Sequence, residues 1–247
     1  MVISLRDVWK SFEGVDVLRG LTLDIDAGET FVVMGKSGCG KSVMLKIILR
    51  LIVPDGGQIV IDGEDTTFYS EKQMMPVRRK IGMLFQGAAL FDSMNVWQNL
   101  AYPLLEHTDI PYDDINKRIT ETLSFVDLDG SQNMMPSELS GGMKKRVALA
   151  RAIIDNPMFV FFDEPTTGLD PVTSGIINDL IIRTREQFGV TSIVVTHDLA
   201  SAMRIGTRYA FIDEGIIAFE GNKKELFNSE QAALQAFLKD ASWQDRS

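Results

Sequence analysis

The 247-residue sequence predicts an α/β fold, in which crossover helices connect parallel strands. Its carboxyl-terminal part carries apolar, strand-like runs at 158–162, 191–196 and 209–213. Helical patterns at about 172–187 and 200–205 separate these runs, and a strand–helix–strand succession implies parallel strands. Hydrophobic residues make up 45% of the chain, which is enough to bury a core and excludes a disordered protein.

The preceding part of the chain adds further elements in order. Apolar and polar residues alternate over 21–25, which predicts a half-buried strand, and the apolar run 30–34 is typical of a strand buried on both faces. A helix is expected over 42–52, followed by a turn and a strand at 58–61. Roughly 87–156 lacks strand-like runs and is expected to form helices.

The end of the chain is expected to complete the sheet. Glu214-Gly215 separates two apolar runs, which predicts a hairpin and a small antiparallel ribbon. The last stretch, 223–238, is expected to form a helix lying on the surface, with a frayed end after it.

Charge and residue counts exclude several classes of protein. Lys and Arg number 25 against 34 Asp and Glu, and the resulting net charge of −9 argues against a dedicated nucleic-acid binder. A single cysteine cannot form an internal disulfide, which favours a reducing cytoplasm, and two histidines exclude a multi-histidine metal site. No apolar run approaches the roughly 18–20 residues that span a bilayer, and we expect no signal peptide.

The strongest motif is a glycine-rich loop between the strand expected at 30–34 and the helix expected at 42–52. It matches G-x-x-x-x-G-K-[ST], and a P-loop requires this strand–loop–helix context. The glycines let backbone N–H groups approach phosphate oxygens, and the helix N-terminus adds positive potential. We expect Lys41 to reach the β- and γ-phosphates and the Ser42 hydroxyl to ligate Mg²⁺. The nucleotide-binding residues of this loop are Gly35, Lys36, Ser37, Gly38, Cys39, Gly40, Lys41 and Ser42.

Two carboxylates follow another apolar run. Asp163 and Glu164 come directly after 159–162, and ligands of α/β sheets bind at the ends of such strands. Asp163 is therefore expected to hold Mg²⁺ through water, and Glu164 to polarise an attacking water molecule.

A third motif, Leu139-Ser140-Gly141-Gly142-Met143, decides the family. Together with the two motifs above, in this order, it makes the sequence resemble the ATP-binding cassette (ABC) ATPases over nearly its whole length. The resemblance implies a P-loop NTPase fold with a RecA-like core, an antiparallel β subdomain and an all-helical signature subdomain. It also implies that the chain hydrolyses ATP with Mg²⁺.

The same resemblance implies roles for further residues. Phe12 lies where the family places a ring to stack on adenine, and Asp170 ends a match to the family's D-loop. Gln86 resembles the Q-loop glutamine, which serves as a catalytic residue and Mg²⁺ ligand and reports the nucleotide state to a membrane partner. His197 resembles the switch histidine, which holds the γ-phosphate during hydrolysis.

The Ser140-Gly141-Gly142 segment has a chemistry of its own. Two glycines at a helix start expose N–H donors and the Ser140 hydroxyl adds another, which makes a second anion site. In the resembled family, the two anion sites that hold one ATP belong to opposite chains, so each ATP lies between the two chains of a dimer. Because this chain carries one site of each kind, the resemblance implies a homodimer. Met143 replaces the usual glutamine and removes its amide contact. The helix expected over 143–153 also carries the basic residues Lys144, Lys145, Arg146 and Arg151.

Within the ABC ATPases, the segment 85–96 looks most like the ATPases of Mla-type, MCE-associated phospholipid transporters of bacteria. This resemblance implies two integral membrane permease subunits, an MCE-type lipid-binding protein and a small cytoplasmic accessory subunit as partners. It places the chain on the cytoplasmic face of the inner membrane. Phe91, Met94 and Trp97, spaced three apart, are expected to form a stripe that contacts the permease, with Leu90 and Val96 in the core.

The resemblance divides one ABC domain into parts: 1–86 and 157–220 as the core with its β subdomain, 87–156 as the signature subdomain, and 221–247 as a terminal helix and tail. Three alternatives stay open. The chain could serve an importer of small solutes such as amino acids, or act as a non-transport ABC module that regulates or scaffolds. It could also be a different P-loop enzyme, such as a kinase or GTPase.

Overall fold

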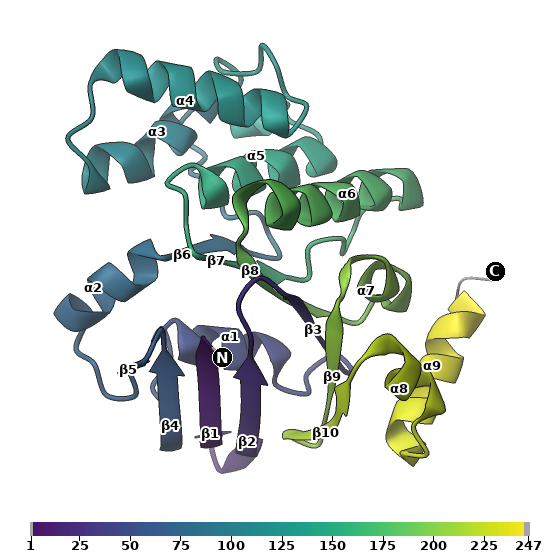
Figure 1. The fold of residues 1–247 in the computed structure, drawn as a ribbon. Helices are drawn as coiled ribbons and strands as arrows, with labels where there is room; N and C mark the ends of the chain where they lie inside the picture. The colour runs from purple at the N-terminus through teal and green to yellow at the C-terminus, as the bar shows by residue number, and fades with distance from the viewer. Residues whose placement is uncertain (1, 245–247) are drawn as a thin grey trace. The chain divides into compact units, whose positions relative to one another are not determined.

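The computed structural model describes residues 2–244, and side chains up to residue 240. The chain forms two compact units, of which Met1–Arg78 and Thr191–Ser247 make up the first and Arg79–Val190 the second (Figure 1). Each unit combines strands with helices, which confirms the predicted α/β class. Among the helices of residues 2–244, none is both long and apolar enough to cross a membrane.

An antiparallel sheet in the first unit has the order β2-β1-β4-β5 (Figure 1). Its strands are β1 (Ile3–Phe12), β2 (Val15–Ile25), β4 (Gly56–Ile61) and β5 (Glu64–Asp65). Leu21, Leu23 and Ile25 are buried whereas Thr22 is exposed, so the half-buried strand predicted over 21–25 is confirmed. The structure extends that strand back to Val15.

A second sheet contains parallel strands. Its strands in this unit are β3 (Thr30–Met34), β8 (Thr191–Thr196), β9 (Arg208–Asp213) and β10 (Ile216–Gly221). β3 lies between β8 and β9, parallel to both, and β9 and β10 form the predicted hairpin. All residues of β3 and β8 are buried, as their apolar composition requires.

The first helices of this unit differ from the sequence prediction. α1 (Lys41–Ile48) ends earlier than the predicted 42–52, because Arg50 takes a left-handed conformation with a φ of 57°. α2 (Glu71–Arg79) was not predicted, since Met74 and Val77 are its only buried residues and give too weak a helical pattern. α7 (Leu199–Ile205) matches its prediction to within one residue.

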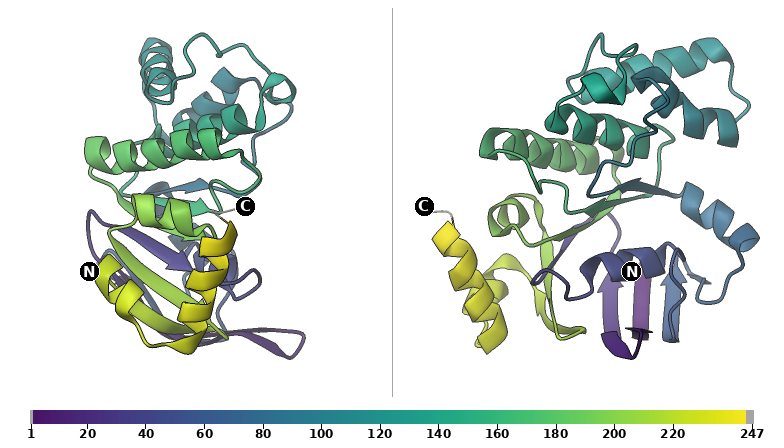
Figure 2. Two further views of the ribbon diagram at one scale, coloured as in Figure 1. Left: turned by 90° about the vertical axis from the view of Figure 1, so that its right-hand side faces the viewer. Right: turned by 180° about the vertical axis from the view of Figure 1, so that it is seen from behind.

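The prediction of one surface helix over 223–238 is wrong. The stretch forms two helices, α8 (Lys223–Asn228) and α9 (Ala232–Gln244), which lie beside β9 and β10 (Figure 2). They are packed rather than loosely attached: Leu226 and Leu234 are fully buried, and the Phe237 ring lies 5.2 Å from that of Phe211 in β9. The frayed end was expected after residue 238, and its last residues, 245–247, lie outside the described part of the chain.

The second unit consists of two parallel strands and a set of helices. Its elements are β6 (Ile81–Leu84), α3 (Val96–His107), α4 (Tyr112–Phe125), a 3-10 turn (Pro136–Glu138), α5 (Gly141–Ile153), β7 (Phe159–Asp163) and α6 (Pro171–Phe188). Residues 87–156 contain helices and no strand, as predicted. α5 lies directly on β6, since a Cβ added to Gly82 would come within 2.0 Å of the Ala152 carbonyl oxygen.

Candidate functional site

At two positions, the P-loop takes a backbone conformation that only glycine permits. Gly40 precedes α1 with a φ of 103°, and a Cβ there would lie 3.0 Å from the Val17 carbonyl oxygen. At Gly35 a Cβ would lie 2.6 Å from the carbonyl oxygen of Ile212. Since no side chain caps the start of α1, its first backbone N–H groups can donate to an anion.

Lys41 lies in this loop with only 5% of its side chain exposed. Its ammonium donates hydrogen bonds to the carbonyl oxygens of Gly35, at 2.8 Å, and Lys36, at 3.0 Å. The loop therefore curls around a buried positive charge, which is the arrangement that binds the phosphates of a nucleotide.

The fold brings His197 and the P-loop to one edge of the parallel sheet. Met34 at the end of β3 pairs in register with Thr196 at the end of β8, so Gly35 and His197 each follow neighbouring strand ends. His197 is exposed in the loop before α7. This placement suits contact with a ligand beyond the strand ends.

Phe12 ends β1, and 42% of it is exposed. The Lys10 ammonium lies 5.3 Å from the centre of its ring and pairs at 2.6 Å with the Asp55 carboxylate. The Lys10 hydrogen bond and two from Ser11 lower the pKa of Asp55 to about 2, so the carboxylate is ionised at neutral pH. The exposed ring is thereby held beside a fixed ion pair.

In the second unit, β6 and β7 bring the carboxylates together with the Q-loop. Leu84 pairs in register with Phe162. Gln86 follows the first strand, whereas Asp163 ends the second and Glu164 comes directly after it. Asp163 is 6% exposed and Glu164 8%. Glu164 has a φ of 48°, which costs a non-glycine residue about 1–3 kcal/mol, and its carboxylate accepts a hydrogen bond from Thr167 at 3.1 Å. Strain of this kind is concentrated at functional sites.

The signature segment begins α5, as predicted. Ser140 is exposed and caps the helix, since its Oγ accepts the Met143 N–H at 3.3 Å. The hydroxyl hydrogen can still donate to a ligand. A Cβ on Gly142 would lie 2.4 Å from the Thr173 side chain, so glycine is required where α5 approaches α6.

Asp170 caps the next helix of this unit. Its carboxylate accepts hydrogen bonds from the Val172 and Thr173 N–H groups, both at 3.0 Å, and from the Thr173 hydroxyl. The Thr173 hydroxyl, with these amides, lowers the pKa of Asp170. The structure thus gives Asp170 a clear role in starting α6.

Sequence reasoning missed the role of Lys145. It is only 5% exposed, and its ammonium donates to the Gln86 carbonyl oxygen at 2.5 Å and to the Glu164 carbonyl oxygen at 3.3 Å. Burial lowers the pKa of Lys145, while the charges of Asp163 and Glu164 act to raise it. Its spacing from Gly142 and Leu149 places Lys145 on one face of the helix with them, and this face is buried, but the spacing does not identify the two carbonyl groups that it binds.

Phe91, Met94 and Trp97 do not form the helical stripe that their spacing predicted. α3 begins only at Val96, so these three residues do not share a helical face. Trp97 packs on α4 instead, where its Nε1 donates to Asn116 at 2.7 Å. Val96 is buried as expected, but Leu90 is only half-buried.

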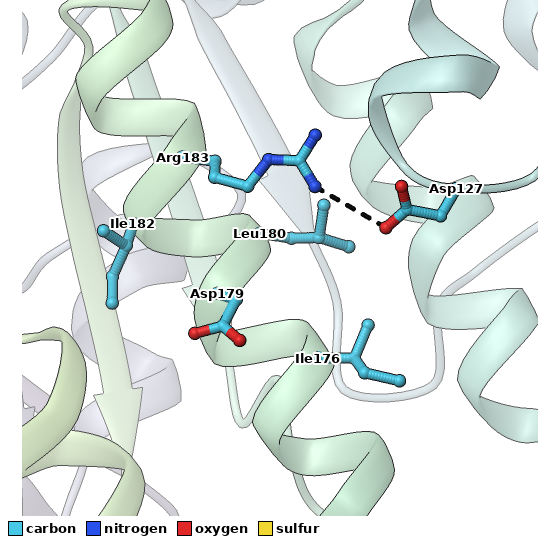
Figure 3. Close-up of a pocket in the computed structure, with 6 residues that line it drawn as sticks. All are labelled: Asp127, Ile176, Asp179, Leu180, Ile182 and Arg183. Atoms are coloured by element: carbon cyan, nitrogen blue, oxygen red, sulfur yellow. Dashed lines mark ion pairs between the residues drawn. The ribbon is translucent and has the colours of Figure 1, made fainter.

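A pocket of about 390 Å³ lies along α6, and none of the predicted site residues lines it. It is lined by Asp127, Ile176, Asp179, Leu180, Ile182 and Arg183. Figure 3 shows Arg183 and Asp127 pointing toward each other, and their charged groups lie 3.5 Å apart. Since none of the six residues belongs to a phosphate-binding or catalytic motif, the pocket has no part in the predicted chemistry.

These features define a class of protein. A glycine-rich loop around a buried lysine, between a buried strand and a helix, and paired carboxylates at another strand end are the parts of a P-loop nucleotide hydrolase. The family model described as "ABC transporter" matches residues 18–167, and the chain belongs to this family as an ATP-binding ATPase domain. The resemblance drawn from the three motifs is confirmed.

Individual relatives agree with this assignment. The intermembrane phospholipid transport system ATP-binding protein MlaF of Haemophilus influenzae is 42% identical over 228 residues, covering 92% of this chain and 86% of its own. The probable ribonucleotide transport ATP-binding protein mkl of Mycobacterium leprae is 37% identical and covers 96% of this chain and 69% of its own. The dimeric ATP-binding cassette MJ0796, solved with ADP and Pi, has a TM-score of 0.82 and 34% identity, over 89% of this chain and 98% of its own.

Proposed function

We propose that the chain works as a homodimer that powers phospholipid transport between the inner and outer membranes of a bacterium. The observation that carries this proposal is the 42% identity, over 92% of the chain, with a protein named for intermembrane phospholipid transport. A dimeric cassette that covers 89% of this chain supports the homodimer.

ATP binds to the P-loop in this proposal. Backbone N–H groups of 35–42 cradle its phosphates, Lys41 exchanges its carbonyl contacts for β- and γ-phosphate oxygens, and Phe12 stacks on the adenine. A hydroxyl from Ser42, an amide oxygen from Gln86 and a carboxylate from Asp163 are the hard oxygen donors that suit Mg²⁺, and these residues would hold it. Bound Mg²⁺ supplies charge neutralisation at the phosphates.

Hydrolysis depends on residues at the strand ends. Glu164 orients a water molecule and accepts its proton, and His197 donates a hydrogen bond to the γ-phosphate. Gln86 senses whether the γ-phosphate is present and passes this state to a membrane partner. The buried setting of Glu164 supports its assignment, because the surrounding chain limits the positions that its carboxylate can take.

The second chain completes each site. Ser140 and the N–H groups of Gly141 and Gly142 donate to the γ-phosphate bound by the partner's P-loop, and Asp170 lies on the segment facing the partner. We assign 87–156 to the signature subdomain, 1–86 with 157–220 to the core, and 221–247 to a terminal segment. Loss of the γ-phosphate removes the shared ligand and lets the two chains separate.

Transport requires further subunits. We propose two integral membrane permeases, an MCE-type lipid-binding protein and a small accessory subunit as partners, with the chain held on the cytoplasmic face of the inner membrane. Phe91, which is 42% exposed, and Tyr102 pack ring to ring at 5.2 Å and offer an apolar contact to a permease.

Co-purification tests this proposal. The tagged full chain is recovered from detergent-solubilised membranes, and its associated proteins and small molecules are identified by mass spectrometry. We expect integral membrane subunits together with phospholipid. Membrane subunits that bind ribonucleotides or amino acids without phospholipid would contradict the lipid assignment, and recovery without any membrane protein would contradict the transport assignment.

A further inference from the structure

Lys145 is a buried cation that has no role in the ATP binding and hydrolysis proposed above. Its side chain is only 5% exposed in the middle of the buried row of α5, where an apolar side chain would fill the same space without the cost of burying a charge. A lysine in such a position must be held by acceptors, and here both acceptors are backbone carbonyl oxygens.

The two acceptors belong to residues of the hydrolytic machinery. One is the carbonyl of Gln86, at 2.5 Å, in the loop after β6, and the other is the carbonyl of Glu164, at 3.3 Å, after β7. Both loops follow neighbouring strands of the second unit, and a single ammonium ties them together. Glu164 also has a left-handed φ of 48°, which the surrounding structure must maintain against its intrinsic preference.

We propose that Lys145 is a positioning residue, which fixes the backbones of Gln86 and Glu164 relative to each other so that Glu164 can orient the attacking water. The inference rests on the proposed function in one respect, namely that Glu164 activates water. Lys145 touches neither nucleotide nor water in this account; it acts through the two carbonyl groups. A ligand-positioning error of about 1 Å lowers rates roughly a hundredfold, so loss of this tie acts mainly on kcat.

The test compares three variants of the full chain. Lys145→Met keeps the length of the side chain but has no donor, whereas Lys145→Arg keeps several donors. Arg146→Met is the matched control, because Arg146 of the same helix also donates to two backbone carbonyls, those of Val126 at 3.2 Å and Asp127 at 2.7 Å, far in sequence from both loops. For each variant, kcat, KM for ATP, ATP affinity and Tm are measured.

We expect Lys145→Met to lower kcat roughly ten- to a hundredfold with little change in KM or ATP affinity. Lys145→Arg recovers much of the lost kcat. Arg146→Met lowers Tm but keeps a kcat near that of the wild type. A purely structural role would instead lower Tm equally in Lys145→Met and Arg146→Met and leave kcat of the folded protein alike in both, which would overturn the proposal.

Two further comparisons keep the outcome decisive. If Lys145→Met does not fold, Lys145→Gln takes its place; its shorter amide cannot reach both carbonyls, so a lower kcat is again expected and a wild-type kcat contradicts the inference. Glu164→Gln is measured in parallel. Normal hydrolysis by Glu164→Gln would contradict the proposed role of Glu164. If Glu164→Gln loses hydrolysis but Lys145→Met turns over normally, the role of Glu164 stands and only the inference about Lys145 is overturned.

Discussion

Glu164 shows how the chain prepares one side chain for chemistry. It is buried directly after an apolar strand, its backbone is strained, and its carboxylate accepts a hydrogen bond from Thr167 three residues on. Each of these features restricts the carboxylate to a narrow range of positions. A group that must orient water benefits from such restriction, since catalysis depends on geometry that is fixed before the substrate arrives.

Glu164→Gln is the residue-scale prediction. Glutamine has nearly the same shape but cannot accept a proton, so we expect ATP binding to persist while kcat falls by roughly a hundredfold or more. Hydrolysis is followed by phosphate release and binding by equilibrium dialysis. Lys46→Ala, in the half-buried face of α1, serves as a control for general effects of substitution. Turnover by Glu164→Gln at the wild-type rate would contradict the assignment.

At the scale of residues, the sequence identifies the candidate motif residues but not the residues that hold their backbones in place. The glycine-rich loop, the paired carboxylates and the signature start could be found because each is a short pattern with a chemical reason. Lys145 donates to residues 59 and 19 positions away, and no local pattern reveals such a bond. In the sequence, Lys145 is noted only as one of several basic residues of this helix, whereas the fold buries it.

At the scale of elements, the loop between β6 and α3 depends on one amide. Asn99 is fully buried; its Oδ1 accepts the Phe91 N–H at 2.9 Å, and its Nδ2 donates to the carbonyl oxygens of Met94, at 2.9 Å, and Asn95, at 3.1 Å. Arg151 of α5 adds a bond to the Ala89 carbonyl at 2.8 Å. These contacts shape the loop that presents Phe91.

Asn99→Leu should therefore lower the free energy of unfolding by about 2–4 kcal/mol, because it leaves several backbone groups of the loop without partners. Urea denaturation measures the change. The exposed Asn133, substituted in the same way, should change stability by no more than about 0.5 kcal/mol. An equally small effect at Asn99 would show that the loop holds its shape by other means.

Element boundaries were harder to predict than element types. The apolar runs 30–34 and 191–196 coincide with β3 and β8, since strands buried on both faces leave a continuous apolar pattern. The apolar residues after Ile48 continued the helical pattern, but the left-handed Arg50 ends the helix there. The sequence pattern likewise did not predict the break between α8 and α9, because apolar residues that become buried occur on both sides of it.

For the whole molecule, the motifs divide between the two compact units. The P-loop, Phe12 and His197 belong to the first, whereas Gln86, the two carboxylates, Asp170 and the signature start belong to the second. Family membership and the dimeric cassette MJ0796 support the proposal that a second chain takes part in the nucleotide site. The sequence predicted a site shared between two chains only through its resemblance to the family, because no pattern within one chain specifies its partner.

Mixing two inactive chains tests this shared site most directly. Lys41→Ala removes the phosphate-binding lysine, and Ser140→Asp keeps a helix cap while its carboxylate repels the γ-phosphate. Each variant alone should hydrolyse little ATP. If the P-loop of one chain works with Ser140 of the other, mixed dimers hold one intact site, and an equal mixture should regain about a quarter of wild-type ATPase activity. A mixture as inactive as its components, with mixed dimers demonstrated by differential tags, would contradict the account.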